Sequence, residues 1–210
     1  PSSVFVYPAR RQTNPNSPPL REEEATPAEP PVSYGWAKII GEKLVQSAVD
    51  EVTGFRAAIG RLIGVYGPGQ DTDPNRASII PALTRRAAEH PTGGAFSIHG
   101  RGLETRSYCY ISDVVDAIIA SVEKLNDAPL LGPVNLGNEG RITIGDLAKQ
   151  IIAVSGKEIQ LQTSEFKPSV WGQAVDCSLA RNLLDGWQPK ISLALGLQKT
   201  YDFVSAQINQ

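Results

Sequence analysis

Short apolar runs rich in β-branched residues alternate with longer segments whose apolar residues recur every three or four positions. This alternation constrains the fold more than any other feature, because strands separated by helices pair in parallel and form α/β sheets. We expect strands at 4–7, 55–65, 95–99, 105–111, 133–136 and 159–162, and helices at 34–49, 78–89, 113–125, 143–155, 178–184 and 193–207. The fold class is therefore α/β.

Local signals mark the connections between these elements. Residues 8–31 are rich in Pro, Asn, Ser and Glu and are expected to form a long loop. Ser33 is expected to be the N-cap of the first helix, because its hydroxyl can accept a hydrogen bond from a free backbone N–H. Thr143 and Asp146 have the spacing of a capping box at a later helix.

Composition excludes several classes of protein. The chain has 210 residues, of which 41% are apolar, so a substantial core is expected. The net charge of −2, with Lys and Arg dispersed, predicts no nucleic-acid partner. No apolar run approaches the roughly 18 residues of a membrane span, so we expect no membrane partner and a cytoplasmic protein. Cys109 and Cys177 lack metal-site spacing; we expect buried free thiols and no metal.

The beginning of the chain lacks a phosphate-binding signature. No Gly-x-Gly-x-x-Gly follows an early strand, and the glycine-rich stretch Gly64–Gly69 contains Pro68 and follows a late strand, which predicts a turn. The chain contains no Met, and its first residues are already β-prone. We therefore expect that a preceding segment has been lost.

The strongest chemical signal is Tyr34-Gly-Trp-Ala-Lys38. Residues four apart share one helix face, and a neighbouring ammonium favours an ionised phenol. Such a pair can exchange a proton with a sugar or alcohol hydroxyl. A hydroxyl at Ser2-Ser3 could donate a hydrogen bond to the reacting oxygen. The spacing alone is also satisfied by a solvent-exposed pair, so both interpretations stay open at this point.

Five motifs occur in a fixed order along nearly the whole chain. They are Ser2-Ser-x-x-Val-Tyr7, Tyr34-x-x-x-Lys38, Arg61-Leu-Ile-Gly-Val-Tyr-Gly-Pro68, Gly100-Arg-Gly-Leu-Glu-Thr-Arg106 and Val134-Asn-Leu-Gly137. This order resembles the extended short-chain dehydrogenases/reductases, the NAD-dependent epimerase/dehydratase family. Tyr7-Pro8, Pro27-Ala-Glu-Pro30 and Leu103-Glu-Thr-Arg-Ser107 resemble the GDP-mannose 3,5-epimerase-like members most.

The resemblance implies an incomplete doubly wound, Rossmann-like parallel sheet with a smaller C-terminal α/β substrate lobe. Residues 1–66 would be the C-terminal part of the dinucleotide-binding domain, and residues 67–210 mainly the substrate-binding lobe, with some segments returning to the sheet. The N-terminal half would be missing, so we expect this chain alone to bind NAD or NADP poorly. It could form a homodimer, or associate with a partner chain that supplies the missing half.

The resemblance also assigns roles to individual residues. Ser3, Tyr34 and Lys38 would be catalytic, and Tyr34, Lys38 and Ile63 would contact the nicotinamide half of the cofactor. A nucleoside-diphosphate sugar would be the substrate. Its diphosphate would meet Arg106, whose planar guanidinium suits such a group, and its nucleotide would lie beside Glu104, Thr105 and Arg86.

Departures from the family pattern narrow the range of reactions that we expect. Phe5 stands where the 3,5-epimerases have an acid/base Cys, and their acid/base Lys falls at about Ser78. The 4,6-dehydratases carry an Asp-Glu pair where Val4-Phe5 stand. The Asn that usually precedes the Val-Tyr-Gly-Pro motif in this family is Gly64 here. The remaining groups fit a 4-epimerase or 4-keto reductase that works by hydride transfer at C4. The alternative is a truncated or degenerate homologue, non-catalytic alone, that binds sugar nucleotides or serves as an assembly module.

Overall fold

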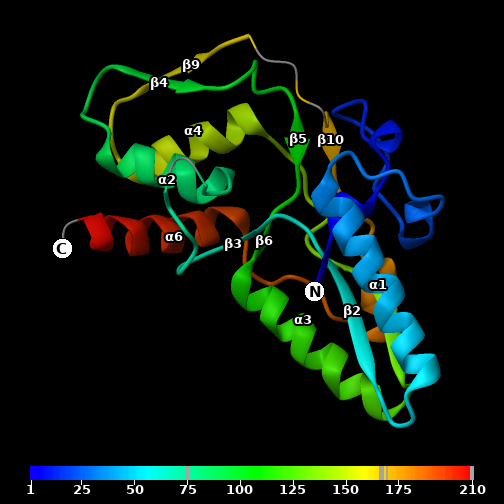
Figure 1. Ribbon diagram of the computed structural model, residues 1–210. Coiled ribbons are helices and arrows are strands. Elements are labelled where there is room, and N and C mark those ends of the chain that lie inside the picture. The colour runs from blue at the N-terminus through cyan, green and yellow to red at the C-terminus, as the bar shows by residue number, and fades with distance from the viewer. Residues whose placement is uncertain (74–75, 166–167, 169, 209–210) are drawn as a thin grey trace.

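The computed structural model describes residues 1–73, 76–165, 168 and 170–208 (Figure 1). A parallel sheet in the order β1–β2–β7 is formed by β1 (Ser2–Ser3), β2 (Ala57–Leu62) and β7 (Leu130–Leu136). The helices α1 (Ser33–Glu51) and α3 (Ile111–Glu123) flank this sheet, and α5 (Ser178–Leu183) contacts β7.

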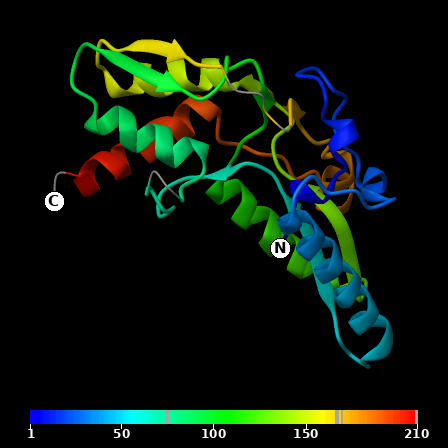
Figure 2. The same cartoon turned by 45° about the horizontal axis from the view of Figure 1, so that its top comes forward.

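A second group of elements forms a separate α/β lobe. The parallel pair β4 (Ala95–Ile98) and β9 (Gln160–Thr163) lies over α2 (Ile79–Glu89) and α4 (Ile144–Ser155), with α6 (Leu193–Ile208) packed against both helices (Figure 2). The apolar faces of these elements meet in one core cluster, which includes Phe96, Leu147, Ile151 and Leu197. The expected α/β class, with a Rossmann-like parallel sheet and a C-terminal α/β lobe, is confirmed.

Short strands connect the sheet to the lobe. The strand β3 (Val65–Tyr66) pairs in parallel with β6 (Cys109–Tyr110). The strand β5 (Thr105–Arg106) pairs in parallel with β10 (Gly172–Gln173) and antiparallel with β8 (Ile142–Thr143). The extended segment expected at 105–111 is thus two strands that belong to two different sheets.

The strand expected at 4–7 is wrong. Only Ser2–Ser3 pair with β2, and Val4–Val6 form the 3₁₀ helix η1. The Ser3 hydroxyl accepts a hydrogen bond from the Phe5 N–H, and the Tyr7 N–H donates to the Val4 carbonyl, so the chain turns after two strand residues. The following loop contains two more 3₁₀ turns, η2 (Ala9–Arg11) and η3 (Glu22–Ala25), and another, η4 (Lys124–Asn126), follows α3.

Of the two N-caps expected from the sequence, the structure confirms one and contradicts the other. Thr143 caps α4 as expected, because its hydroxyl accepts a 3.0 Å hydrogen bond from the Asp146 N–H. Ser33 is not an N-cap: it is the first residue of α1, and Val32 precedes it in an extended conformation without a side-chain cap. In the described part of the chain, none of the helices combines the length and apolarity needed to cross a membrane.

Candidate active site

Tyr34 and Lys38 lie side by side on the first turns of α1. The Lys38 ammonium is 5.3 Å from the centre of the Tyr34 ring and donates a 3.2 Å hydrogen bond to the Pro1 carbonyl, at the start of β1. The Tyr34 side chain is half exposed. The helix spacing therefore brings the two side chains together and directs Lys38 toward the strand that carries Ser3.

The start of α1 packs closely on the turn that follows Ser3. A Cβ atom at Gly35 would lie 2.1 Å from the Phe5 carbonyl oxygen, so only glycine fits there without a shift of the backbone. The rings of Phe5 and Tyr34 meet edge to face with their centres 6.0 Å apart. Ser3 is buried, and its oxygen already accepts from the Phe5 N–H at 3.3 Å. Phe5 thus lies directly beside the proposed catalytic phenol.

A buried ionic group that sequence reasoning missed lies one turn beyond Lys38. The Glu42 carboxylate accepts two hydrogen bonds from Arg61 on β2 and one of 2.5 Å from the Ser2 hydroxyl. Burial alone lowers the pKa of Arg61, but its hydrogen bond to Glu42 and the nearby Tyr7 raise it well above the usual value. Ser2, Lys38 and Glu42 all line a cavity of about 220 Å³. The sequence signal for this group was the spacing of four between Lys38 and Glu42, which indicates that both side chains lie on one face of the helix.

The same network continues into the loop and into β7. Arg61 also donates to the Tyr7 hydroxyl at 3.2 Å, which itself donates a 2.6 Å hydrogen bond to the Asn135 side-chain oxygen. The Asn135 N–H donates to the Glu22 carboxylate at 2.8 Å. Burial raises the pKa of Tyr7 and also that of Glu22. These contacts join β2, β7 and the loop behind the Tyr34 helix.

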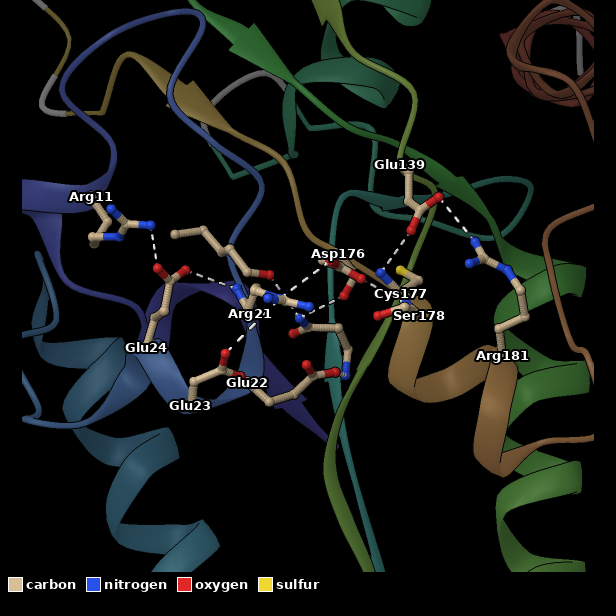
Figure 3. Close-up of polar contacts among 12 residues, drawn as sticks. Arg11, Arg21, Glu22, Glu23, Glu24, Glu139, Asp176, Cys177, Ser178 and Arg181 are labelled. Atoms are coloured by element: carbon tan, nitrogen blue, oxygen red, sulfur yellow. Dashed lines mark hydrogen bonds and ion pairs between the residues drawn. The ribbon is translucent and has the colours of Figure 1, made fainter.

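A second polar cluster fastens the loop to α5 (Figure 3). Arg21 pairs with Asp176 at 3.4 Å, and Asp176 accepts a 2.8 Å hydrogen bond from the Ser178 N–H at the start of the helix. Glu139 accepts from the Cys177 N–H at 2.9 Å and from Arg181 at 3.0 Å. All of these groups are paired with one another, so the cluster holds the loop in place.

Arg86 and Glu104 line one cavity of about 730 Å³ in the second lobe. The remaining lining residues come from α2, from β4 and the residue after it, from the start of α4 and from the residue after β9: Ile79, Ala82, Leu83, Ser97, Ile98, His99, Ile144 and Ser164. Arg86 donates a 2.6 Å hydrogen bond to the Ser97 carbonyl, and its guanidinium lies 4.4 Å from the centre of the Phe96 ring. Arg86 and Glu104, which the family resemblance placed beside the same nucleotide, therefore line one cavity.

Thr105 and Arg106 follow Glu104 on β5 and make mostly backbone contacts. The Thr105 hydroxyl donates to the Pro15 carbonyl. Arg106 donates to the Thr105 and Val170 carbonyls at 2.8 and 2.9 Å and makes no ion pair within the described ranges. Burial lowers the pKa of Arg106. The nearby Tyr108 and Glu104 oppose this lowering, so the half-buried guanidinium has an acidic neighbour although it makes no ion pair with it.

Ile63 directly follows the carboxyl end of β2. Its side chain is 1% exposed and packs in the core cluster that contains Val4, Val6 and Val175. A Cβ atom at Gly137 would lie 1.9 Å from the Ile63 side chain, so glycine at 137 leaves the space that Ile63 fills. Ile63 therefore packs in one cluster with the segment that follows Ser3.

Three kinds of comparison agree on the family. A family model described as the NAD dependent epimerase/dehydratase family matches residues 1–137. GDP-mannose 3,5-epimerase of Arabidopsis thaliana is 28% identical over 209 residues, which are 100% of this chain and 53% of that protein. GDP-L-fucose synthase of Sinorhizobium fredii is 34% identical over 193 residues, 89% of this chain and 60% of that protein.

A solved structure gives the same result. UDP-glucuronic acid 4-epimerase from Bacillus cereus, in complex with UDP-glucuronic acid and NAD, superposes with a TM-score of 0.79 at 25% identity, covering 98% of this chain and 60% of that one. The chain spans about half to three fifths of the length of the relatives it matches.

Proposed function

This chain belongs to the NAD dependent epimerase/dehydratase family, and we propose that it is part of an enzyme that interconverts or reduces a nucleoside-diphosphate sugar by hydride transfer at C4. The observation that carries the proposal is the placement of Lys38 beside Tyr34, with its ammonium reaching the strand of Ser3. The relatives named as a 4-epimerase and as sugar-nucleotide enzymes support the same class of reaction.

The proposed mechanism uses three side chains of this chain. Tyr34 moves a proton to or from the C4 oxygen of the sugar, since its phenol is half exposed and accessible to a ligand. Lys38 stabilises the ionised phenol through its positive charge. Ser3 orients the C4 oxygen once its hydroxyl turns from the Phe5 N–H toward the ligand.

The residues present fit the nicotinamide half of NAD or NADP. Lys38 retains N–H groups beyond the one that it donates to Pro1, and these suit ribose hydroxyls. Ile63 would form part of the apolar floor of this site, since it packs in the same core cluster as Val4 and Val6 of η1. The nicotinamide ring, when bound, supplies the hydride chemistry at C4.

The substrate would extend from this site into the second lobe. Arg106 would meet the diphosphate, because its half-buried guanidinium makes no ion pair within the described ranges. Thr105 would hold the adjoining backbone through its bond to Pro15, and Arg86 and Glu104 would contact the nucleotide in the 730 Å³ cavity. Residues 1–66 would then serve the cofactor and 67–210 mainly the substrate.

One observation favours a non-catalytic module as the second candidate. The Phe5 ring lies against Tyr34, where it takes up space beside the phenol. In that case the chain would bind sugar nucleotides, or assemble with a partner, without turning the sugar over.

The test combines binding with turnover. The chain is incubated with a nucleoside-diphosphate sugar or its 4-keto form and with NAD or NADPH in large excess, which offsets the weak cofactor binding expected of this chain, and products are separated by chromatography. We expect Tyr34→Phe to abolish turnover and leave substrate affinity nearly unchanged, whereas Arg106→Ala weakens affinity in calorimetry and folds normally. Parent protein that binds the sugar nucleotide without turnover supports the non-catalytic module. Equal affinity of Arg106→Ala and parent removes Arg106 from the site.

A further inference from the structure

A cavity of about 300 Å³ lies at the carboxyl end of β7. Its polar and aromatic lining comes from the loop after β7, from α5 and from the loop after α5: Asn138, Glu139, Arg181, Trp187 and Gln188. Ligands of open α/β sheets bind beyond the carboxyl ends of the strands. In the sheet order, β2 separates β7 from the strand of Ser3, and no lining residue belongs to the proposed cofactor or sugar-nucleotide site.

The walls of this cavity are held in place by contacts within the protein. Figure 3 shows the Glu139 carboxylate between Cys177 and Arg181; it accepts hydrogen bonds of 2.9 Å from the Cys177 N–H and 3.0 Å from the Arg181 guanidinium. The Asn138 side-chain oxygen accepts from the Gly140 N–H at 2.8 Å, which fixes the loop after β7. A site that is already formed costs little ordering when a ligand binds.

Several hydrogen-bonding groups at the cavity are unused. In the part of the chain that the structure describes, neither the Trp187 indole N–H nor the Gln188 side-chain amide has a hydrogen-bond partner. Asn138 uses its side-chain oxygen and not its NH₂ group. Arg181 retains N–H groups beyond the one donated to Glu139, and each Glu139 oxygen retains a lone pair. The cavity therefore offers donors and acceptors together, beside an aromatic ring.

The charges at the cavity favour a neutral ligand. Arg181 and Glu139 neutralise each other through their ion pair, so a charged ligand would meet one like charge and compete with the existing pair. A hydroxyl group both donates and accepts, so it can bond to the spare N–H groups of Arg181 and to the spare lone pairs of Glu139 without separating them. Trp187 and Pro189 add apolar surface for the C–H face of a saturated ring.

We propose that this cavity is a binding site for a neutral monosaccharide. Its volume lies near the lower end of the range for ligand sites, about 300–1,000 Å³, which suits one small ring and not a nucleotide sugar. The inference is independent of the proposed function, since it uses neither the Tyr34–Lys38 pair nor Arg106.

Saturation-transfer NMR of sugar protons tests this proposal on the parent chain. At least one of D-glucose, D-galactose and D-mannose should show transfer, with a dissociation constant of about 1 mM from a few neutral hydrogen bonds. The 2-amino and uronic acid forms of that sugar carry a positive and a negative charge. Each should bind about 3- to 10-fold more weakly, because each faces one like charge. Glycine, a small zwitterion, should bind more weakly than the neutral sugar.

Variants locate the sugar at this cavity. Gln188→Leu removes an exposed amide and should weaken binding about 3- to 10-fold, the usual effect of one neutral hydrogen bond. Gln198→Leu changes an exposed amide on α6 and is the matched control, which should bind like the parent. Arg106→Ala should also bind the sugar normally, because Arg106 does not line this cavity.

Each contrary result overturns the proposal. Absence of transfer from all three neutral sugars at about 20-fold above the expected dissociation constant shows that the cavity takes none of them. Charged forms or glycine that bind as tightly as the neutral sugar contradict the assignment of a neutral ligand. Unchanged binding in Gln188→Leu places the sugar elsewhere, and a loss in Arg106→Ala places it in the site of the proposed function. The comparison of ligands needs only the parent chain, so it decides the matter even where Gln188→Leu misfolds.

Discussion

The guanidinium of Arg61 donates hydrogen bonds of 2.9 and 2.8 Å to the two carboxylate oxygens of Glu42. Each residue is only 6% exposed. Glu42 also accepts from Ser2, so one carboxylate ties α1, β1 and β2 together. The distance between the Tyr34 helix and the Ser3 strand is therefore fixed inside the protein, behind the exposed phenol.

Removal of one partner from this ion pair should be strongly destabilising. Glu42→Ala leaves the Arg61 charge buried without its acid, and the free energy of unfolding should fall by about 3–5 kcal/mol. Urea denaturation followed by circular dichroism measures the change. Glu89→Ala breaks the exposed Arg85–Glu89 pair instead and should cost less than about 1 kcal/mol. A similar small loss in both variants would contradict the structural role of Glu42.

Asp176 should make the stability of the chain sensitive to acid. Its hydrogen bonds with Ser178 and the nearby Arg21 lower its pKa below the usual value. A lowered folded-state pKa stabilises the fold above the ordinary aspartate pKa of about 3.9, and this stabilisation is lost as the pH falls through the folded-state value. Asp176→Asn should therefore melt at a lower temperature than the parent at pH 7, and the difference should shrink below about pH 4. A difference that is constant with pH would be inconsistent with this assignment.

Patterns confined to one element predicted the fold well. The periodic apolar residues predicted the helix at 34–49, and the spacing of Tyr34 and Lys38 predicted that their side chains share one face of it. Thr143 predicted the start of α4. These signals act within one or two helical turns. The strand expected at 4–7 was wrong, because a Ser3 hydroxyl bonded to the Phe5 N–H can turn an apolar run that otherwise favours a strand.

The polar interior could not be foreseen in the same way. Tyr7 and Asn135 form a hydrogen bond across 128 residues of sequence, and no local pattern encodes such a pairing. The apolar stripe of α1 was visible in sequence, yet Trp36, Ile40 and Leu44 are exposed and the polar Glu42 is buried. Periodicity identifies an apolar helix face and does not reveal which elements cover it.

Both thiols should be unreactive in the folded protein. Cys109 and Cys177 are free and buried, and burial raises the pKa of each to about 12. Since the thiolate is the reactive form, Ellman's reagent at pH 8 should release almost no chromophore from the native chain. In concentrated guanidinium chloride both thiols should react. Rapid reaction of one thiol without denaturant would show that its part of the structure opens readily.

Gly64 should tolerate substitution much less well than Gly54. Both have a positive φ, of 50° and 81°, so alanine costs about 1–2 kcal/mol at either position from backbone conformation alone. They differ in surroundings: a Cβ atom at Gly64 would lie 2.1 Å from the Ser107 carbonyl oxygen, whereas nothing lies within 4 Å at Gly54.

The close approach at Gly64 joins the end of β2 to the segment that follows Arg106. The Cys109 N–H donates to the Gly64 carbonyl at 3.1 Å, next to the β3–β6 pairing, so backbone on both sides must shift to admit a methyl group. Overpacking of this kind costs about 1–3 kcal/mol beyond the conformational term. Urea denaturation should thus show Gly64→Ala losing about 2–5 kcal/mol and Gly54→Ala about 1–2 kcal/mol. Equal losses would mean that the two segments can separate freely, and that the glycine found here in place of the family's usual asparagine is not required by their contact.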